Sequence, residues 1–159
     1  MKIIFKNLII ICLLIAVCSS CKKKSSVVPD PVVIPDTTKP TITIVQPTAG
    51  KGYIAGNTIA FQATFSDNKE LKNYDIAVSK VVTGGMVLKI VPTVVAFSYV
   101  KTATSLGSGV KQQEIVLSDI IIPANTATTI VATGKYNFKV TCTDAANNTA
   151  ETILEININ

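Results

Sequence analysis

Apolar and polar residues alternate along most of this chain, and that period of two is the feature that most constrains its fold. The clearest example is 57–66, NTIAFQATFS, in which Ile59, Phe61, Ala63 and Phe65 share one face. Successive side chains of a β-strand point to opposite faces, so this alternation predicts strands with one buried face. No stretch after Thr41 sustains the 3.6-residue period of a helix. The sequence therefore predicts an all-β domain.

Turn-forming residues divide the pattern into about seven short strands. We expect one strand that begins at Thr41, five strands at 57–66, 72–79, 113–122, 134–143 and 149–158, and a seventh in the apolar stretch 81–101. Strand register is not assigned for 80–111, where Gly84-Gly85 and Pro92 interrupt the pattern. Short strands with one apolar face predict a single immunoglobulin-like antiparallel β-sandwich over 41–159. A small closed barrel is the alternative.

The first 21 residues have the order of an export signal. Lys2 and Lys6 precede an apolar run from Leu8 to Cys18, and small residues lead to Cys21. The run is too short to cross a bilayer as a helix. The segment resembles a bacterial lipoprotein signal, which implies removal of 1–20 and diacylglycerol and N-acyl lipids on Cys21. An ordinary cleaved secretory signal is the alternative.

Residues 21–40 are expected to form an extended tether. Four prolines, together with Ser, Asp and Thr, preclude a helix and favour a semi-rigid chain. The lysines at 22–24 suit anionic lipid headgroups beside the anchor. From Thr37 on there are ten lysines, eight acidic residues and no arginine, so no basic face for a nucleic-acid partner is expected.

The composition also argues against an enzyme. The chain contains no histidine, which excludes Ser-His-Asp and Cys-His arrangements and the usual zinc sets. Asp67 and Glu70 are the one carboxylate pair considered for acid–base work, and a solvated turn is the preferred interpretation. Cys142, the cysteine that remains after lipidation, lies on an apolar strand face and is expected to be a buried hydrophobic residue.

Aromatic residues give few candidates for ligand contact. The chain has no tryptophan, and Tyr74 and Tyr136 are predicted to point inward. Tyr136 is expected to be the corner tyrosine that ties its strand to the preceding connection. Tyr53 and Tyr99 remain as candidate surface contacts.

Three stretches carry a resemblance to known modules. The sequences DTTKP at 36–40, FSDN at 65–68 and GKYNFKVTCTDAAN at 134–147 are similar to those of bacterial Ig-like and cadherin-like domains. With the signal, the chain resembles a family of Bacteroidota lipoproteins whose domain has no known function. The resemblance covers about 36–159, implies the sandwich fold and supplies no catalytic residues.

Topology suggests one metal site. If the first strand starts at one end of the sandwich, the second and the penultimate strands must finish there. Asp and Asn residues lie at each of these points and would provide the oxygen ligands that calcium prefers. Turn formation by the same residue types is the alternative interpretation. The candidate calcium ligands are Asp36, Asp67, Asn68, Asp144 and Asn147.

These features predict a lipid-anchored, non-catalytic module of the outer membrane that binds a protein or glycan partner at the cell envelope, for adhesion or recognition. A spacer or accessory subunit of an outer-membrane complex, such as a glycan-uptake system, is the alternative, and a hydrolase is a weaker one. The sequence does not fix the face of the membrane, although lysines rather than acidic residues after Cys21 favour the periplasmic side.

Overall fold

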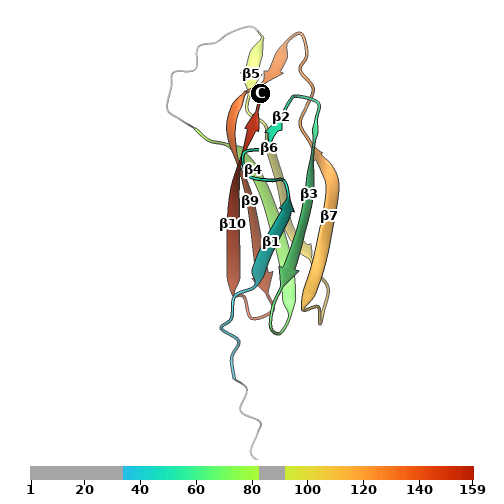
Figure 1. Ribbon diagram of the computed structural model, residues 1–159, viewed down its shortest axis with the longest axis vertical. Coiled ribbons are helices and arrows are strands. Elements are labelled where there is room, and N and C mark those ends of the chain that lie inside the picture. The colour runs from blue at the N-terminus through green and yellow to red at the C-terminus, as the bar shows by residue number, and fades with distance from the viewer. Residues whose placement is uncertain (1–33, 83–91) are drawn as a thin grey trace, which may run out of the picture. The chain divides into compact units, whose positions relative to one another are not determined.

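The structure, a computed structural model, describes residues 34–82 and 92–159. The expected signal, the expected lipidation site Cys21 and most of the expected tether lie outside the described residues, as does the 83–91 part of the apolar stretch. Pro35–Asn159 forms one compact unit (Figure 1). None of the described residues belongs to a helix long and apolar enough to span a membrane.

The described chain is all-β. Its strands are β1 (Thr41–Gln46), β2 (Gly52–Tyr53), β3 (Thr58–Ser66), β4 (Leu71–Lys80), β5 (Thr93–Val95), β6 (Ser98–Ser105), β7 (Gln112–Ile121), β8 (Thr129–Val131), β9 (Gly134–Asp144) and β10 (Thr149–Ile158). The strands β3, β4, β7, β9 and β10 begin and end within two residues of the predicted bounds, because turn residues interrupt the alternation there. The apolar stretch 81–101, expected to hold one strand, instead contains β5 and the start of β6, which runs on to Ser105.

Two sheets face one another across a single core (Figure 1). One sheet has the strand order β1-β3-β7, and the other has the order β2-β10-β9-β4-β6. All pairs in these sheets are antiparallel except β2 with β10. A short parallel pair of β5 and β8 lies apart from the two main sheets. This is the immunoglobulin-like sandwich that the alternation predicts.

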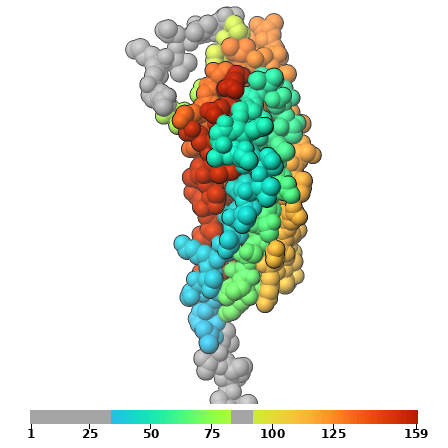
Figure 2. Space-filling view, viewed as in Figure 1, coloured from blue at the N-terminus to red at the C-terminus, as the bar shows by residue number. Residues whose placement is uncertain are grey.

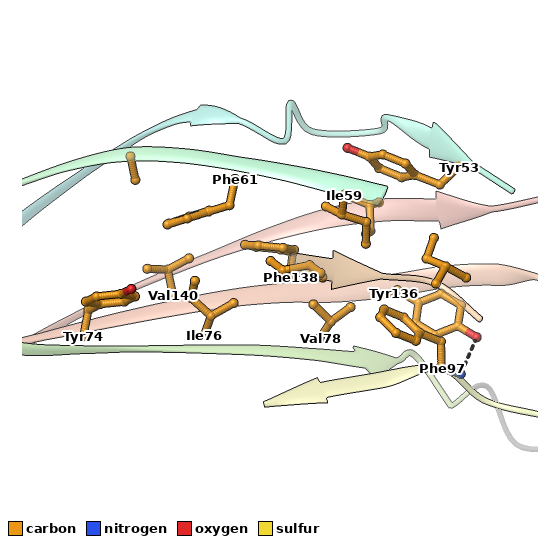
Figure 3. Packing of buried hydrophobic residues seen from close by; sticks show 14 of the residues in the cluster. Tyr53, Ile59, Phe61, Tyr74, Ile76, Val78, Phe97, Tyr136, Phe138 and Val140 are labelled. Carbon is orange, nitrogen blue, oxygen red and sulfur yellow. Dashed lines mark hydrogen bonds between the residues drawn. The ribbon is translucent and has the colours of Figure 1, made fainter. Parts of the chain in front are cut away.

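The core consists of the inward faces that the period of two identifies. Phe61 of β3 stacks on Phe138 of β9 with ring centroids 5.7 Å apart (Figure 3). Phe65 stacks on Tyr74 at 5.3 Å. The other inward residues of β4 and β9 are also fully or almost fully buried: Ile76, Val78, Tyr136, Val140 and Cys142. Apolar burial on this scale, at about 25 cal/mol per Å², is the main stabilising term of such a domain.

Tyr136 is the corner tyrosine that the sequence predicts. Its hydroxyl donates to the carbonyl oxygen of Ala132 at 2.6 Å and accepts from the backbone N–H of Phe97 at 3.3 Å (Figure 3). The ring is fully buried and contacts that of Phe97. One side chain therefore joins the start of β9 to the connection between β5 and β6.

The prediction that Tyr53 is a surface contact is wrong. Parallel pairing of β2 with the end of β10 holds its side chain against the core, and only 8% of the residue is exposed. Tyr99 is partly buried against the core, and its hydroxyl donates to Asp119 Oδ2 at 3.3 Å. Tyr99 thus connects the edge strands β6 and β7, with only part of its surface left for a partner.

Candidate metal site

Three aspartates meet at the end of the sandwich where the chain enters. Thr41, the first residue of β1, pairs with Ser66, the last residue of β3, so both strands reach the same end. Leu71, which opens β4, pairs with Asp144 at the end of β9. As a result Asp36, Asp67 and Asp144 offer carboxylate oxygens that all lie within 4.8 Å of one another.

Turn hydrogen bonds hold each carboxylate in place. Asp67 Oδ1 accepts from the N–H groups of Lys69 at 2.8 Å and Glu70 at 2.9 Å, and Asp36 Oδ1 accepts from Thr38 N at 3.1 Å. Asp144 Oδ1 accepts from Asn148 N at 2.7 Å. These bonds are the local turn chemistry that Asp favours.

Turn chemistry does not account for the whole cluster. Asp67 Oδ2 is buried and accepts no hydrogen bond from the described residues. Asp144 is fully buried. Burying a carboxylate oxygen without a partner is costly, so such an atom in a native structure needs an explanation. A bound cation beside Asp67 Oδ2 would provide one.

The donor set fits calcium. Ca²⁺ takes six to eight oxygen ligands at about 2.3–2.6 Å, so oxygens on opposite sides of the ion are about 4.6–5.2 Å apart. Three carboxylate oxygens within 4.8 Å of one another can therefore contact one such ion. Asp144 Oδ2 accepts from Asn148 Nδ2 at 2.7 Å, and a carboxylate oxygen has a second lone pair for a metal.

Cys142 is affected by the charge of the cluster. Burial, together with the smaller effect of the Asp67 and Asp144 carboxylates, raises the pKa of this thiol from 9.0 to about 12. The residue is fully buried and is a free cysteine within the described part of the chain. A thiol in this state is a packing residue rather than a nucleophile or a metal ligand.

The structure places the two predicted asparagine ligands differently from the aspartates. Asn68 is exposed in the turn after β3. Asn147 is exposed with a φ of 68°, and its Oδ1 accepts from Lys72 Nζ at 2.7 Å. The left-handed backbone turns the Asn147 side chain toward Lys72 instead of the carboxylates, which corrects its assignment to the calcium shell.

Asn148, which is not among the predicted ligands, is the asparagine that reaches the cluster. Its Nδ2 donates to Asp144 Oδ2 and to the carbonyl oxygens of Asp36 at 3.1 Å and Thr38 at 3.2 Å. The signal in the sequence is the Asn147-Asn148 doublet: one asparagine takes the left-handed turn position, which leaves the next for the site.

The surface depression that Glu70 lines does not include Asp67. A depression of about 300 Å³ is lined by Glu70, Lys72 and residues of the 105–108 loop, and Asp67 is not among its lining residues. Glu70 Oε1 accepts from Gly109 N at 2.7 Å and Ser108 Oγ at 3.3 Å. Its carboxylate therefore fixes a loop, which argues against the acid–base pair.

Comparison with known proteins places the chain in a family. A solved structure of fibronectin(III)-like modules of CbhA from Clostridium thermocellum is 16% identical with a TM-score of 0.38, and the match covers 75% of this chain and 46% of that one. The chain thus spans about half the length of that structure. No curated protein matches. The family model described as a domain of unknown function, DUF4625, matches residues 19–159, and the chain belongs to this family.

Proposed function

We propose that this protein is a lipid-anchored, non-catalytic module of the cell envelope that binds calcium where its tether joins the domain and recognises a partner with the rest of its surface. The observation that carries the proposal is the meeting of the Asp36, Asp67 and Asp144 carboxylates, in which the buried Asp67 Oδ2 has no hydrogen-bond partner among the described residues. The signal-like sequence before Cys21 supports the anchor and the outer-membrane location.

Calcium would act here on structure rather than on a reaction. Its ligands come from the segment before β1, from the β3–β4 turn and from the end of β9, so one ion would join three separate parts of the chain. An ion that binds only the folded state stabilises it by mass action. The domain would therefore be stiffest in a calcium-rich extracellular or periplasmic medium.

The exposed apolar residues favour a protein partner over a glycan. Among the described residues the large exposed hydrophobic side chains are all aliphatic, whereas glycan sites generally rely on exposed aromatic rings. Ile121 is 59% exposed and pairs with Thr58 at the start of β3, the opposite end of that strand from Asp67. Val94 and Val95 of β5 are also about half exposed.

Thermal unfolding of the full chain in detergent tests the calcium site. Calcium at 100 times its dissociation constant adds about 2.7 kcal/mol to the free energy of unfolding. For a domain of this size we expect Tm to rise by about 5–15 °C relative to excess chelator. Asp144→Asn should abolish the rise, whereas Glu151→Gln, which removes an exposed carboxylate of β10, should keep it. An equal Tm in calcium and chelator for the natural chain would reject the site.

Site-directed photo-crosslinking in cells tests partner recognition. A photoreactive side chain at Val95 should give a cross-link to one protein, and the same group at the exposed Thr43 of β1 should not. Cross-linking of the same protein from both positions would instead favour a spacer that is enclosed in a larger complex.

A further inference from the structure

The candidate calcium site joins two kinds of chain segment. Asp67 and Asp144 adjoin long strands whose ladders hold them in the sandwich. Asp36 lies before β1, in residues that form no strand. The site therefore combines two ligands that the sheets fix with one ligand from the chain that enters the domain.

Asn148 ties this entering segment to the site. Its Nδ2 group has two hydrogens for three acceptors: Asp144 Oδ2, the carbonyl oxygen of Asp36 and that of Thr38. The bonds to the two carbonyl oxygens, at 3.1 and 3.2 Å, are longer than the 2.7 Å bond to the carboxylate. Hydrogen bonds that share hydrogens in this way are individually weak, so the Asn148 amide alone holds residues 36–38 only weakly against the domain.

Charge decides what the segment does when no ion is bound. Three carboxylates this close repel one another when they are ionised, and a divalent cation converts that repulsion into attraction. Asp36 is the carboxylate that can leave, because no ladder holds its backbone. Figure 2 shows this segment, in pale blue, on the surface at the same end as the green β3–β4 region.

We propose that calcium latches residues 36–38 onto the domain through Asp36 and Asn148, and that loss of the ion releases them. This inference rests on the proposed function, because it assigns a regulatory role to the same site. By linkage, docking of the segment must raise calcium affinity by the same factor by which calcium favours docking, so Asn148 contributes to affinity without being a ligand.

A nitroxide label at position 37 measures the docking directly. Thr37 is exposed, so Thr37→Cys offers an accessible thiol in a full chain whose Cys12, Cys18 and Cys21 are replaced by serine. Cys142 is fully buried and its thiol pKa is about 12, so it stays unlabelled. We expect a broad, immobilised electron paramagnetic resonance spectrum in calcium and a narrow, mobile one in excess chelator. A spectrum that is the same in both would overturn the latch.

Calcium titration by calorimetry separates the latch from the site itself. Asn148→Ala should lower calcium affinity by about tenfold, within the range typical of coupled sites. Glu151→Gln is the control and should bind as the natural chain does. Calcium binding and a Tm rise with no change in label mobility would reject the latch and leave the proposed function standing. No calcium binding to the natural chain would reject both.

Discussion

Two adjacent asparagines in the turn between β9 and β10 show how a single backbone angle can determine what a side chain contacts. Asn147 has a φ of 68° and points its amide to Lys72, while Asn148 returns to the cluster and bonds to Asp144. The two residues have the same chemistry. Their different contacts follow from the left-handed turn position, which Asn tolerates better than most residues.

This difference predicts that Asn147→Gly keeps the calcium response. Glycine adopts a positive φ at little cost, so the substitution removes the contact with Lys72 and leaves the turn intact. We expect the rise of Tm in calcium to match that of the natural chain in a thermal unfolding experiment. A lost response in Asn147→Gly would show that this asparagine is a ligand after all.

Cys142 predicts how stability depends on alkaline pH. Its pKa is about 12 in the folded chain, against 9.0 for an ordinary cysteine, because burial and two carboxylates disfavour the thiolate. Between these values the unfolded chain loses its thiol proton and the folded chain keeps it. The free energy of unfolding should therefore fall as pH rises from 9 to 12, by up to about 1.4 kcal/mol per pH unit from this group.

The contribution of the thiol can be isolated by substitution. Urea unfolding of the natural chain and of Cys142→Ala should give curves of stability against pH whose slopes differ in this alkaline range and agree below it. Equal slopes throughout would mean that the thiol also ionises readily in the folded state.

At the scale of elements, the corner tyrosine predicts a large effect of one oxygen atom. Tyr136→Phe leaves the buried Phe97 N–H and Ala132 carbonyl without this partner, at a cost of about 1–3 kcal/mol. Tyr99→Phe is the matched control: its hydroxyl bonds to the exposed Asp119 and should matter by about 1 kcal/mol or less. Denaturant unfolding measures both, and equal effects would contradict the assigned role of the corner.

Long strands could be predicted from sequence because they show several repeats of the two-residue period. The strands β3, β4, β9 and β10 each have at least three successive apolar residues at alternate positions, which identify their buried faces. The short strands β2, β5 and β8 have two or three residues and show no period. They form only through pairing with strands that are distant in the sequence, so the sequence pattern does not show that Tyr53 is buried.

The site was partly predictable for the same reason. Strand direction alone brings Asp36, Asp67 and Asp144 to one end, since it depends only on the order of antiparallel strands. The choice between Asn147 and Asn148 depends on local backbone angles, and the buried Asp67 Oδ2 depends on packing around the turn. Neither local backbone angles nor packing around a turn produces a periodic pattern in the sequence, so these two features could not be predicted from it.

At the scale of the whole molecule, the entering segment predicts how truncation affects the domain. A chain that begins at Pro35 keeps Asp36 and should unfold at a higher temperature in calcium than in chelator. A chain that begins at Thr41 lacks this ligand and the buried Pro40. It keeps every strand of the two sheets and should still unfold cooperatively, but it should lose most of the rise of Tm in calcium. Circular dichroism during heating compares the two, and an equal response to calcium would place the site elsewhere.

The position of β10 has a consequence for how the protein is made. This strand is the last in the sequence, yet it lies inside its sheet, between β2 and β9. Synthesis from the N-terminus therefore delivers a central strand after all of its neighbours, and the five-stranded sheet cannot close until residues 149–158 have left the ribosome. If the protein is exported as proposed, this order would keep the sheet open, and the polypeptide able to pass through a membrane, until β10 has been made.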